Sequence, residues 1–158
     1  MSMNKRLPGS IALLLKEVKG YFHTHGRSYL PWRPTSRKAT KGKPNLTPYH
    51  VLVSELMLQQ TQVERVIPFY KKFIKKFPTA RALARAKLPG VLVVWQGLGY
   101  NRRAKFLHQA AKIIAKKGFP KTVSEIEALP GVGHYTARAV AAFAFNKSEI
   151  FIETNIRT

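Results

Sequence analysis

The chain has 158 residues, with 28 Lys and Arg against seven acidic residues, all of them Glu, and a formal net charge of +21. Its apolar content of 45% is ordinary for a globular protein and excludes a disordered tail, and the lack of cysteine excludes a disulfide framework or a thiolate metal site in this chain. So large an excess of basic residues requires an acidic partner, and a nucleic-acid backbone is favoured over a membrane surface. A small ribosomal protein is the alternative class of protein that this composition allows.

Targeting and metal-binding signals are missing from the sequence. The opening stretch MSMNKRLPGS has no apolar h-region, and no apolar run in the chain is long enough for a membrane span. The five histidines lack the spacing of metal ligands, so no metal site is expected. We therefore expect an intracellular protein of the cytoplasm or nucleoid.

The first third of the chain predicts one helix followed by a loop. Apolar residues at helical spacing follow Ser10, a candidate N-cap, and this helix should end near Gly26. A basic loop that contains Gly and Pro is predicted for residues 35–45. Four apolar side chains of the helix are expected to face a core: Leu14, Leu15, Val18 and Phe22.

The middle of the chain predicts further helices. Thr47 followed by Pro48 is a good helix start, and the second helix is expected to run through VLVSELMLQQTQ to Gln62. Pro68 should then open a third helix, and Thr79 should cap a short fourth one. The stretch VLVVWQ resembles a strand but has no partner strand, so we interpret it as a helical turn that QGLGY ends.

The last third predicts a basic amphipathic helix and a helical hairpin. Asn101 should cap the basic helix and Gly118 should close it. Thr122 with Glu125 forms a capping-box pattern that starts a helix, and a helix of small residues begins at His134. The hairpin is therefore predicted to span residues 123–145. The whole pattern predicts an all-α fold.

Glu55 is a lone carboxylate in the apolar run HVLVSELML, whose helix should be buried nearly all round. Charged groups are rarely buried without a partner. Burial favours the protonated form of a carboxyl group, and a general acid must be protonated. Gln59 and Gln62 would lie on the same helical face as Glu55. The alternative is a core Glu that a backbone group or an Arg satisfies.

The sequence LPGVGHYTARAVAAFAF, residues 129–145, has glycines at 131 and 133 between two predicted helices. Glycines allow a close approach of the backbone to a ligand, and the N-terminus of the following helix carries a partial positive charge. This is the helix-hairpin-helix pattern that binds a DNA backbone without reading its sequence. The alternative is a plain turn with a glycine cap.

Two smaller patterns add candidates. IETNIR places a second carboxylate, Glu153, beside Asn155 at the start of another predicted helix, where both could also serve as capping residues. Tyr100 lies between a Gly-rich turn and basic residues, and Trp32 lies beside Arg33. Aromatic residues in such places can stack on bases or enter a duplex as a wedge, whereas core packing is the commoner role of Trp.

These pieces together resemble the helix-hairpin-helix DNA glycosylases, and most closely the A/G-specific adenine glycosylases of the MutY type, which remove adenine mispaired with 8-oxoguanine. Four stretches carry the resemblance: LPWR at 30–33, PYHVLVSELMLQQTQVERVIPFYKKF at 48–73, WQGLGYNRRAKFLHQAA at 95–111, and 119–145 with LPGVGHYTARAVAAFAF. The resemblance covers most of the chain from about residue 10. It implies a single glycosylase core over residues 1–158, made of a six-helix barrel domain and part of a second helical lobe, and truncated at its C-terminus.

The resemblance also implies roles for four catalytic residues. Glu55 matches the glutamate that protonates the flipped adenine at N7 and helps to activate water. Glu153 stands where the family has the Asp that stabilises the oxocarbenium-like sugar. Tyr135 matches the position of the Schiff-base Lys in bifunctional relatives such as endonuclease III, which implies a monofunctional enzyme. Tyr135 and Asn155 would support the two carboxylates.

Further residues match binding positions of the family. Arg33 matches a residue near the adenine pocket, and Gln60 and Tyr100 match residues that fill or wedge the stack at the oxidised guanine. The implied partner is double-stranded DNA with an A:8-oxoguanine or A:G mismatch, bound by a monomer. Residues implied to contact the DNA backbone are Gly131, Val132, Gly133 and Thr136.

The chain departs from the family in two respects. Glu153 replaces the Asp, which keeps the charge on a longer side chain. Typical members continue into a segment with four Cys that bind a 4Fe-4S cluster and into a domain that recognises 8-oxoguanine, so a cluster is expected only if the protein continues beyond Thr158. Two alternatives remain open: a thymine or uracil mismatch glycosylase of the same fold, and a non-catalytic helix-hairpin-helix DNA-binding module.

Overall fold

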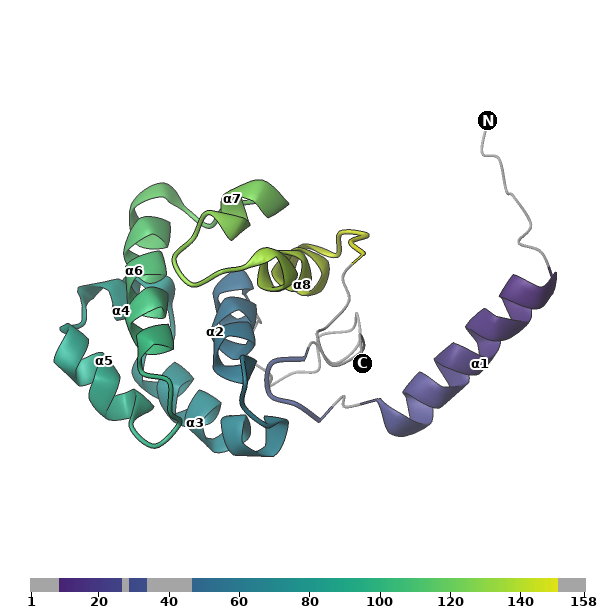
Figure 1. The fold of residues 1–158 in the computed structure, drawn as a ribbon, viewed down its shortest axis with the longest axis horizontal. Coiled ribbons are helices and arrows are strands. Elements are labelled where there is room, and N and C mark those ends of the chain that lie inside the picture. Colours follow the sequence, from purple (N-terminus) through teal and green to yellow (C-terminus); the bar gives the residue numbers. More distant parts are fainter. Residues whose placement is uncertain (1–8, 27–28, 34–46, 151–158) are drawn as a thin grey trace.

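The computed structural model describes residues 9–26, 29–33 and 47–150. Within these ranges it contains no strand, which confirms the all-α prediction (Figure 1). The predicted basic loop 35–45, Glu153 and Asn155 lie outside the described residues. The helices of the described part are α1 (Gly9–His25), α2 (Pro48–Leu58), α3 (Val63–Lys76), α4 (Ala80–Arg85), α5 (Leu88–Trp95), α6 (Arg102–Lys117), α7 (Val123–Glu127) and α8 (His134–Phe145).

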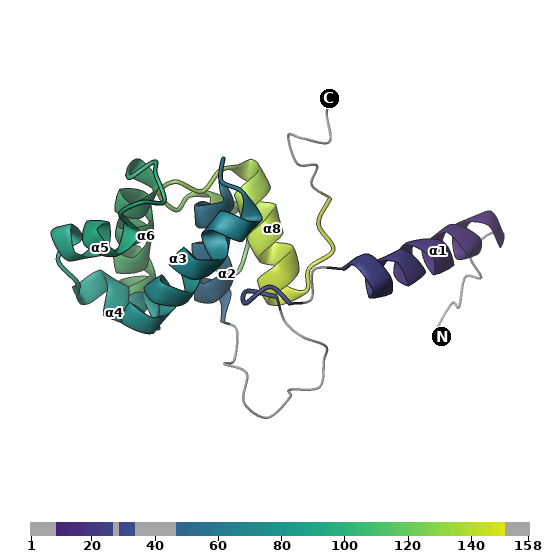
Figure 2. The ribbon, with the colours of Figure 1, turned by 90° about the horizontal axis from the view of Figure 1, so that it is seen from below.

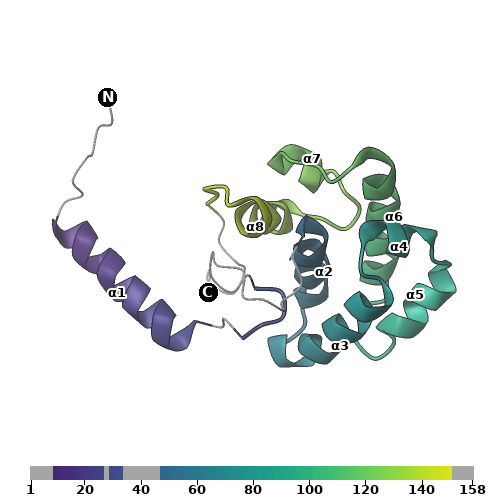
Figure 3. The same cartoon turned by 180° about the vertical axis from the view of Figure 1, so that it is seen from behind.

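Helix α2 is the centre of the core. Residues 49–57 are all buried, and α2 packs against α3, α6 and α8. Figures 1 and 3 show α2 between α8 on one side and α3 and α6 on the other. Burial all round is what the apolar circumference of this segment predicts. The lone carboxylate of Glu55 is therefore placed inside the core by the helix that carries it.

Most helix starts follow the predicted capping residues. Thr47 precedes α2 with Pro48 at its first position, and the side chain of Thr79 accepts a hydrogen bond from the Ala82 amide at 3.1 Å. The Thr122 hydroxyl accepts from the Glu125 amide at 3.3 Å, and the Thr122 amide donates back to the Glu125 carboxylate at 3.1 Å. These bonds satisfy amides that have no acceptor within a helix.

The end of α2 differs from the prediction. The helix ends at Leu58 rather than Gln62, because the C-cap residue Gln59 leaves the helical conformation with ψ of 115°, and Gln60 then adopts a left-handed one with φ of 54°. Carbonyl groups of the last turn of α2 accept hydrogen bonds from Arg103 of α6. Gln62 therefore lies outside α2, and the prediction that it shares the helical face of Glu55 is wrong.

Helices α3 and α5 also differ in extent from the prediction. α3 begins at Val63, five residues before the predicted start, and Pro68 lies inside it. Pro68 lies beyond the first turn, so α3 lacks one backbone hydrogen bond there and the proline ring crowds the carbonyl four residues earlier. α5 is a full helix from Leu88 to Trp95 rather than a single turn, with Pro89 in its first turn. Gly118 ends α6 as predicted, with φ of 83°.

Helix α1 does not join the core. None of its residues is buried, and Leu14 and Phe22 are 58% and 64% exposed, so the prediction that its apolar side chains face the core is wrong. Figures 1 and 2 show α1 apart from the other helices. In the part of the chain that the structure describes, no element covers the apolar side of α1. Among the described helices, none is long and apolar enough to cross a membrane.

Candidate active site

A cavity of about 910 Å³ lies beside α2, where separate parts of the sequence meet. Its volume falls in the range of roughly 300–1,000 Å³ that is typical of small-molecule pockets. Residues of segment 29–33, the α2–α3 turn, the start of α6, the hairpin and α8 line it. Seven of the site residues that the family resemblance implied are in its wall: Arg33, Glu55, Gln60, Tyr100, Gly131, Tyr135 and Thr136.

Glu55 is the carboxylate of this cavity. It is 9% exposed and lies in the second half of α2, where Leu30, Trp32 and Leu58 are its apolar neighbours in the cavity wall. A carboxyl group in this place can reach a molecule that binds in the cavity. The arrangement is suited to a group that gives a proton to a bound molecule.

The wall opposite α2 comes from the start of α8. Tyr135 is half-buried and lines the cavity, and Thr136 is buried with its hydroxyl group 3.3 Å from the amide nitrogen of Gln59. The same Gln59 nitrogen donates to the carbonyl of Gly131 at 3.3 Å. Gln59 therefore joins the end of α2 to the hairpin, and Thr136 faces this contact rather than solvent.

The hairpin between α7 and α8 uses its two glycines differently. Gly131 has φ of 77°, and a side chain there would lie 2.7 Å from Cβ of Phe106, so both conformation and space require glycine. Gly133 is exposed, and a Cβ there would meet nothing within 4 Å. Val132 is buried and anchors the turn. The backbone at Gly133 is therefore open to a ligand, at the N-terminus of α8 where a helix attracts anions.

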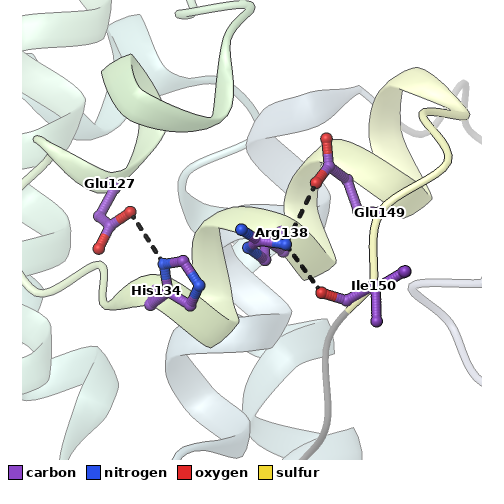
Figure 4. A network of polar contacts seen from close by, with 5 residues as sticks. All are labelled: Glu127, His134, Arg138, Glu149 and Ile150. Carbon is purple, nitrogen blue, oxygen red and sulfur yellow. Dashed lines mark hydrogen bonds and ion pairs between the residues drawn. The ribbon is translucent and has the colours of Figure 1, made fainter.

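Polar contacts join α8 to neighbouring segments (Figure 4). His134 at its start lies 3.3 Å from the Glu127 carboxylate at the end of α7. Arg138 lies 3.7 Å from the Glu149 carboxylate and donates to the Ile150 carbonyl at 2.9 Å. These contacts attach the hairpin and the segment after α8 to the same helix.

Segment 29–33 closes another side of the cavity. Trp32 is buried and meets the Tyr70 ring edge-on, with centroids 5.2 Å apart. The guanidinium carbon of Arg33 lies 4.2 Å from the ring centroid of Phe143, a cation–π contact. Arg33 therefore presents a positive charge at the cavity.

Gln60 and Tyr100 lie at the mouth of the cavity on two different turns. Both side chains are exposed, and both residues have left-handed backbones, with φ of 54° and 47°. Such conformations are uncommon for residues other than glycine. The structure thus places these two predicted residues where they can meet a bound molecule.

The sequence reasoning missed Arg103, and it named Gln59 only as a neighbour of Glu55 on a helical face. Arg103 is buried in α6 on the same stripe as Ala104 and Leu107, and it contacts the turns that carry Gln60 and Tyr100. A charged residue within an apolar helical stripe is the signal that identified Glu55, and it would also have identified Arg103. The spacing that marked Gln59 did not predict its contacts with Gly131 and Thr136, because these depend on where α2 ends.

No donor set for a metal or cluster is found in the described part of the chain. The described residues contain no group of three His, Cys, Asp or Glu that could bind a metal ion. The chain also has no cysteine, so it offers no thiolate ligand for the iron–sulfur cluster of the resembling family. The residues present do not fit that cluster.

Comparisons with known proteins agree with this arrangement. Residues 53–157 match the family described as HhH-GPD superfamily base excision DNA repair protein. An adenine DNA glycosylase from Mycolicibacterium smegmatis is 44% identical over 139 residues, which cover 86% of this chain and 44% of that protein. One from Mycobacterium tuberculosis is 42% identical over 144 residues, which cover 89% of this chain and 47% of that protein. The chain thus spans less than half the length of these two relatives.

Solved structures share the helical arrangement. A thermostable thymine-DNA glycosylase matches with a TM-score of 0.66 and 25% identity, over 87% of this chain and 65% of that chain. A non-covalent complex of endonuclease III with DNA matches with a TM-score of 0.70 and 20% identity, over 96% of this chain and 66% of that chain. The predicted helix-hairpin-helix glycosylase fold is confirmed.

Proposed function

The chain belongs to the HhH-GPD superfamily of base excision DNA repair proteins, and from this premise we propose that it removes adenine from double-stranded DNA by hydrolysing the N-glycosidic bond. The proposed substrate is adenine opposite 8-oxoguanine or guanine. The observation that carries the proposal is Glu55, a buried carboxylate on the wall of a cavity that residues of the hairpin and α8 also line. The relatives named adenine DNA glycosylase support the choice of base.

The proposed reaction begins with extrusion of the adenine nucleotide from the duplex. A base in the stack cannot reach a catalytic group, so the enzyme must rotate it into a pocket. The N-terminal end of α8 and the open backbone at Gly133 would hold a phosphate of the DNA strand during this step. Gln60 and Tyr100 at the cavity mouth would fill the space that the base leaves.

Glu55 would then donate a proton to N7 of the adenine, which makes the base a better leaving group. As the bond between the sugar and the base breaks, positive charge develops on the sugar, and a nearby anion stabilises it. Glu153 is proposed for this role. Water adds to the sugar, and Glu55, now a carboxylate, would accept its proton.

The proposed enzyme is monofunctional. Strand cleavage by related enzymes needs an amine that forms an imine with the sugar, and the phenol of Tyr135 cannot form one. Among the described residues that line the cavity, none is a lysine. The product would therefore be an intact strand with an abasic site.

The test is an excision assay on duplexes that differ in one pair. The chain is incubated with labelled duplexes that contain A:8-oxoguanine, A:G, T:G or U:G, and each sample is divided between alkali and neutral buffer. Alkali-dependent cleavage at the adenine is the expected result. Cleavage at T or U would replace the adenine proposal with the mismatch enzyme that the resemblance to thymine-DNA glycosylase allows. Binding without cleavage of any duplex would indicate a DNA-binding module.

A further inference from the structure

Arg103 is a buried cation without a carboxylate partner in the described part of the chain. It is 6% exposed, and neither of the ion pairs found among the described residues includes it. Its first terminal nitrogen, Nη1, donates to the carbonyls of Leu56 at 3.2 Å and Met57 at 2.8 Å, and also to the carbonyl of Gln59. The other, Nη2, donates to the Thr61 hydroxyl at 3.0 Å and to the Gly99 carbonyl at 3.2 Å.

Carbonyl groups and aromatic rings replace the missing carboxylate. Three of the five acceptors belong to the end of α2 or directly follow it, where a helix carries a partial negative charge and its last carbonyls lack partners within the helix. The guanidinium carbon lies 5.8 Å from the Trp95 ring and 5.0 Å from the Tyr100 ring, which adds cation–π attraction. Desolvation lowers the pKa of Arg103, but a guanidinium group remains protonated in proteins.

The acceptors of Arg103 surround the two strained residues of the site. Gln60 lies between Gln59 and Thr61, both of which accept from the Arg103 side chain. Gly99 precedes Tyr100, and the backbone amide of Arg103 donates to the Tyr100 carbonyl at 2.9 Å. Left-handed conformations of residues other than glycine persist only where their surroundings enforce them. One side chain therefore constrains both turns at once.

We propose that Arg103 is a positioning residue that holds Gln60 and Tyr100 at the mouth of the cavity, so that both can act on a duplex when a base is extruded. The proposal rests on the proposed function, since it assigns both side chains to the opened base stack. A lysine cannot take this role, because an ammonium group is a single point of charge and cannot span acceptors on two turns.

The experiment follows base extrusion separately from base excision. A duplex that carries 2-aminopurine in place of the target adenine becomes more fluorescent when that base leaves the stack. Arg103→Lys is compared with the unchanged chain and with Arg85→Lys, the same substitution at an exposed position of α4. Affinity for the duplex, the fluorescence increase at saturation and amide exchange of residues 59–62 and 97–101 are measured for all three.

Arg103→Lys is expected to bind the duplex within about threefold of the unchanged chain, since phosphate contacts dominate affinity. The fluorescence increase should fall at least about fivefold, which corresponds to the loss of several charge-assisted hydrogen bonds. Amides of both turns should exchange faster, and Arg85→Lys should match the unchanged chain. A full fluorescence increase with unchanged exchange in Arg103→Lys would overturn the proposal.

A second variant tests the positioning role of Arg103 if Arg103→Lys does not fold. Thr61→Val removes one acceptor of Arg103 and leaves the others, so the fold should persist. It should reduce the fluorescence increase by about two- to threefold, because the Thr61 hydroxyl both accepts from Arg103 and donates to the Gln59 carbonyl at 3.3 Å; an unchanged increase would overturn the proposal. A fluorescence increase without excision in the unchanged chain would contradict the glycosylase reaction and leave the role of Arg103 standing.

Discussion

Glu55 and Tyr135 are the two residues whose side chains set the proposed chemistry. Glu55→Gln keeps the size of the side chain but removes the proton that the base would receive. We expect excision of adenine to fall by about 100-fold or more, the usual contribution of a general acid, with DNA affinity nearly unchanged. Single-turnover excision and fluorescence anisotropy measure the two quantities. Excision retained by the Gln variant would remove Glu55 from the mechanism.

Tyr135→Lys places an amine on the cavity wall. If Tyr135 faces the sugar, we expect some strand cleavage and a covalent enzyme–DNA adduct that borohydride traps, because a primary amine can form an imine with the opened sugar. The adduct would appear as a slower band on a denaturing gel. Tyr135→Phe is the control, since it forms no imine, and a trapped band with Phe would show that another amine is responsible.

Two buried histidines make the stability of the fold depend on pH. Burial lowers the pKa of His50, whose Nδ1 accepts hydrogen bonds from the amide of Thr47 at 3.2 Å and from its hydroxyl at 2.8 Å. Burial likewise lowers the pKa of His108, whose Nε2 donates to the Ala86 carbonyl at 2.9 Å. As the pH falls through about 6.5, the unfolded chain binds protons that the folded chain does not. The two histidines therefore leave the stability of the fold unchanged well above about pH 6.5, and they lower it as the pH falls below that value.

We expect the melting temperature to fall between about pH 7.5 and about pH 5.5, and thermal denaturation followed by circular dichroism measures it. His50→Gln combined with His108→Gln should flatten this dependence. Hydrogen bonds with Thr122 lower the pKa of the exposed Glu125 carboxyl group. Its folded and unfolded pKa values both lie below about pH 5.5, so Glu125 should contribute to the pH dependence only at lower pH. A melting temperature that is the same throughout this range would contradict the assignment.

At the scale of helices, the separation of α1 from the core has a measurable result. A helix of 17 residues, none of which is buried among the described residues, is marginal in water. We expect its amides to exchange with solvent close to the rate of an unfolded peptide, whereas those of the buried α2 exchange slowly. Hydrogen–deuterium exchange with mass spectrometry compares the two. Slow exchange in α1 would mean that a surface covers it in solution.

The sequence predicted helix starts better than helix ends. Thr47 with Pro48, Thr79, and Thr122 with Glu125 act through bonds to residues two or three positions away, so local pattern is enough to find them. The end of α2 depends on Arg103, which lies more than 40 residues further along the chain. The exposure of α1 likewise depends on packing, which helical spacing in one segment does not determine.

In the site, too, local patterns could be predicted from the sequence, whereas contacts between distant residues could not. Glu55 was identified because a charge in an apolar stripe is visible locally, and Gly131 because glycines between two helices allow a ligand to approach the backbone. Other roles came only from family resemblance, such as those of Gln60 and Tyr135. The contacts of Gln59 with Gly131 and Thr136 join residues more than 70 positions apart, and no local signal marks them.

For the whole molecule, charge predicts how binding responds to salt. Residues 65–124 contain no acidic residue, and the net charge of the chain is +21. We expect the logarithm of the DNA-binding constant to fall linearly with the logarithm of salt concentration, by about 0.9 for each phosphate neutralised. Arg102→Gln, at the cavity wall, should reduce the slope by about 0.9, and Arg85→Gln on α4 should leave it unchanged. Anisotropy titrations at several salt concentrations give the slopes, and equal reductions by both variants would contradict the cavity face as the binding face.

The two tryptophans of the chain lie in places that make them optical reporters of different events. Trp32 is a wall of the cavity, whereas Trp95 is fully buried, edge-on to Phe73, with Arg103 nearby. Indole emission depends on the polarity of its surroundings and on neighbouring charges. A ligand that enters the cavity should therefore change the emission of Trp32, and a disturbance of the turns around Arg103 should change that of Trp95. With Trp32→Phe and Trp95→Phe variants, occupancy of the site and rearrangement of its mouth can be timed separately in one stopped-flow experiment without an added label.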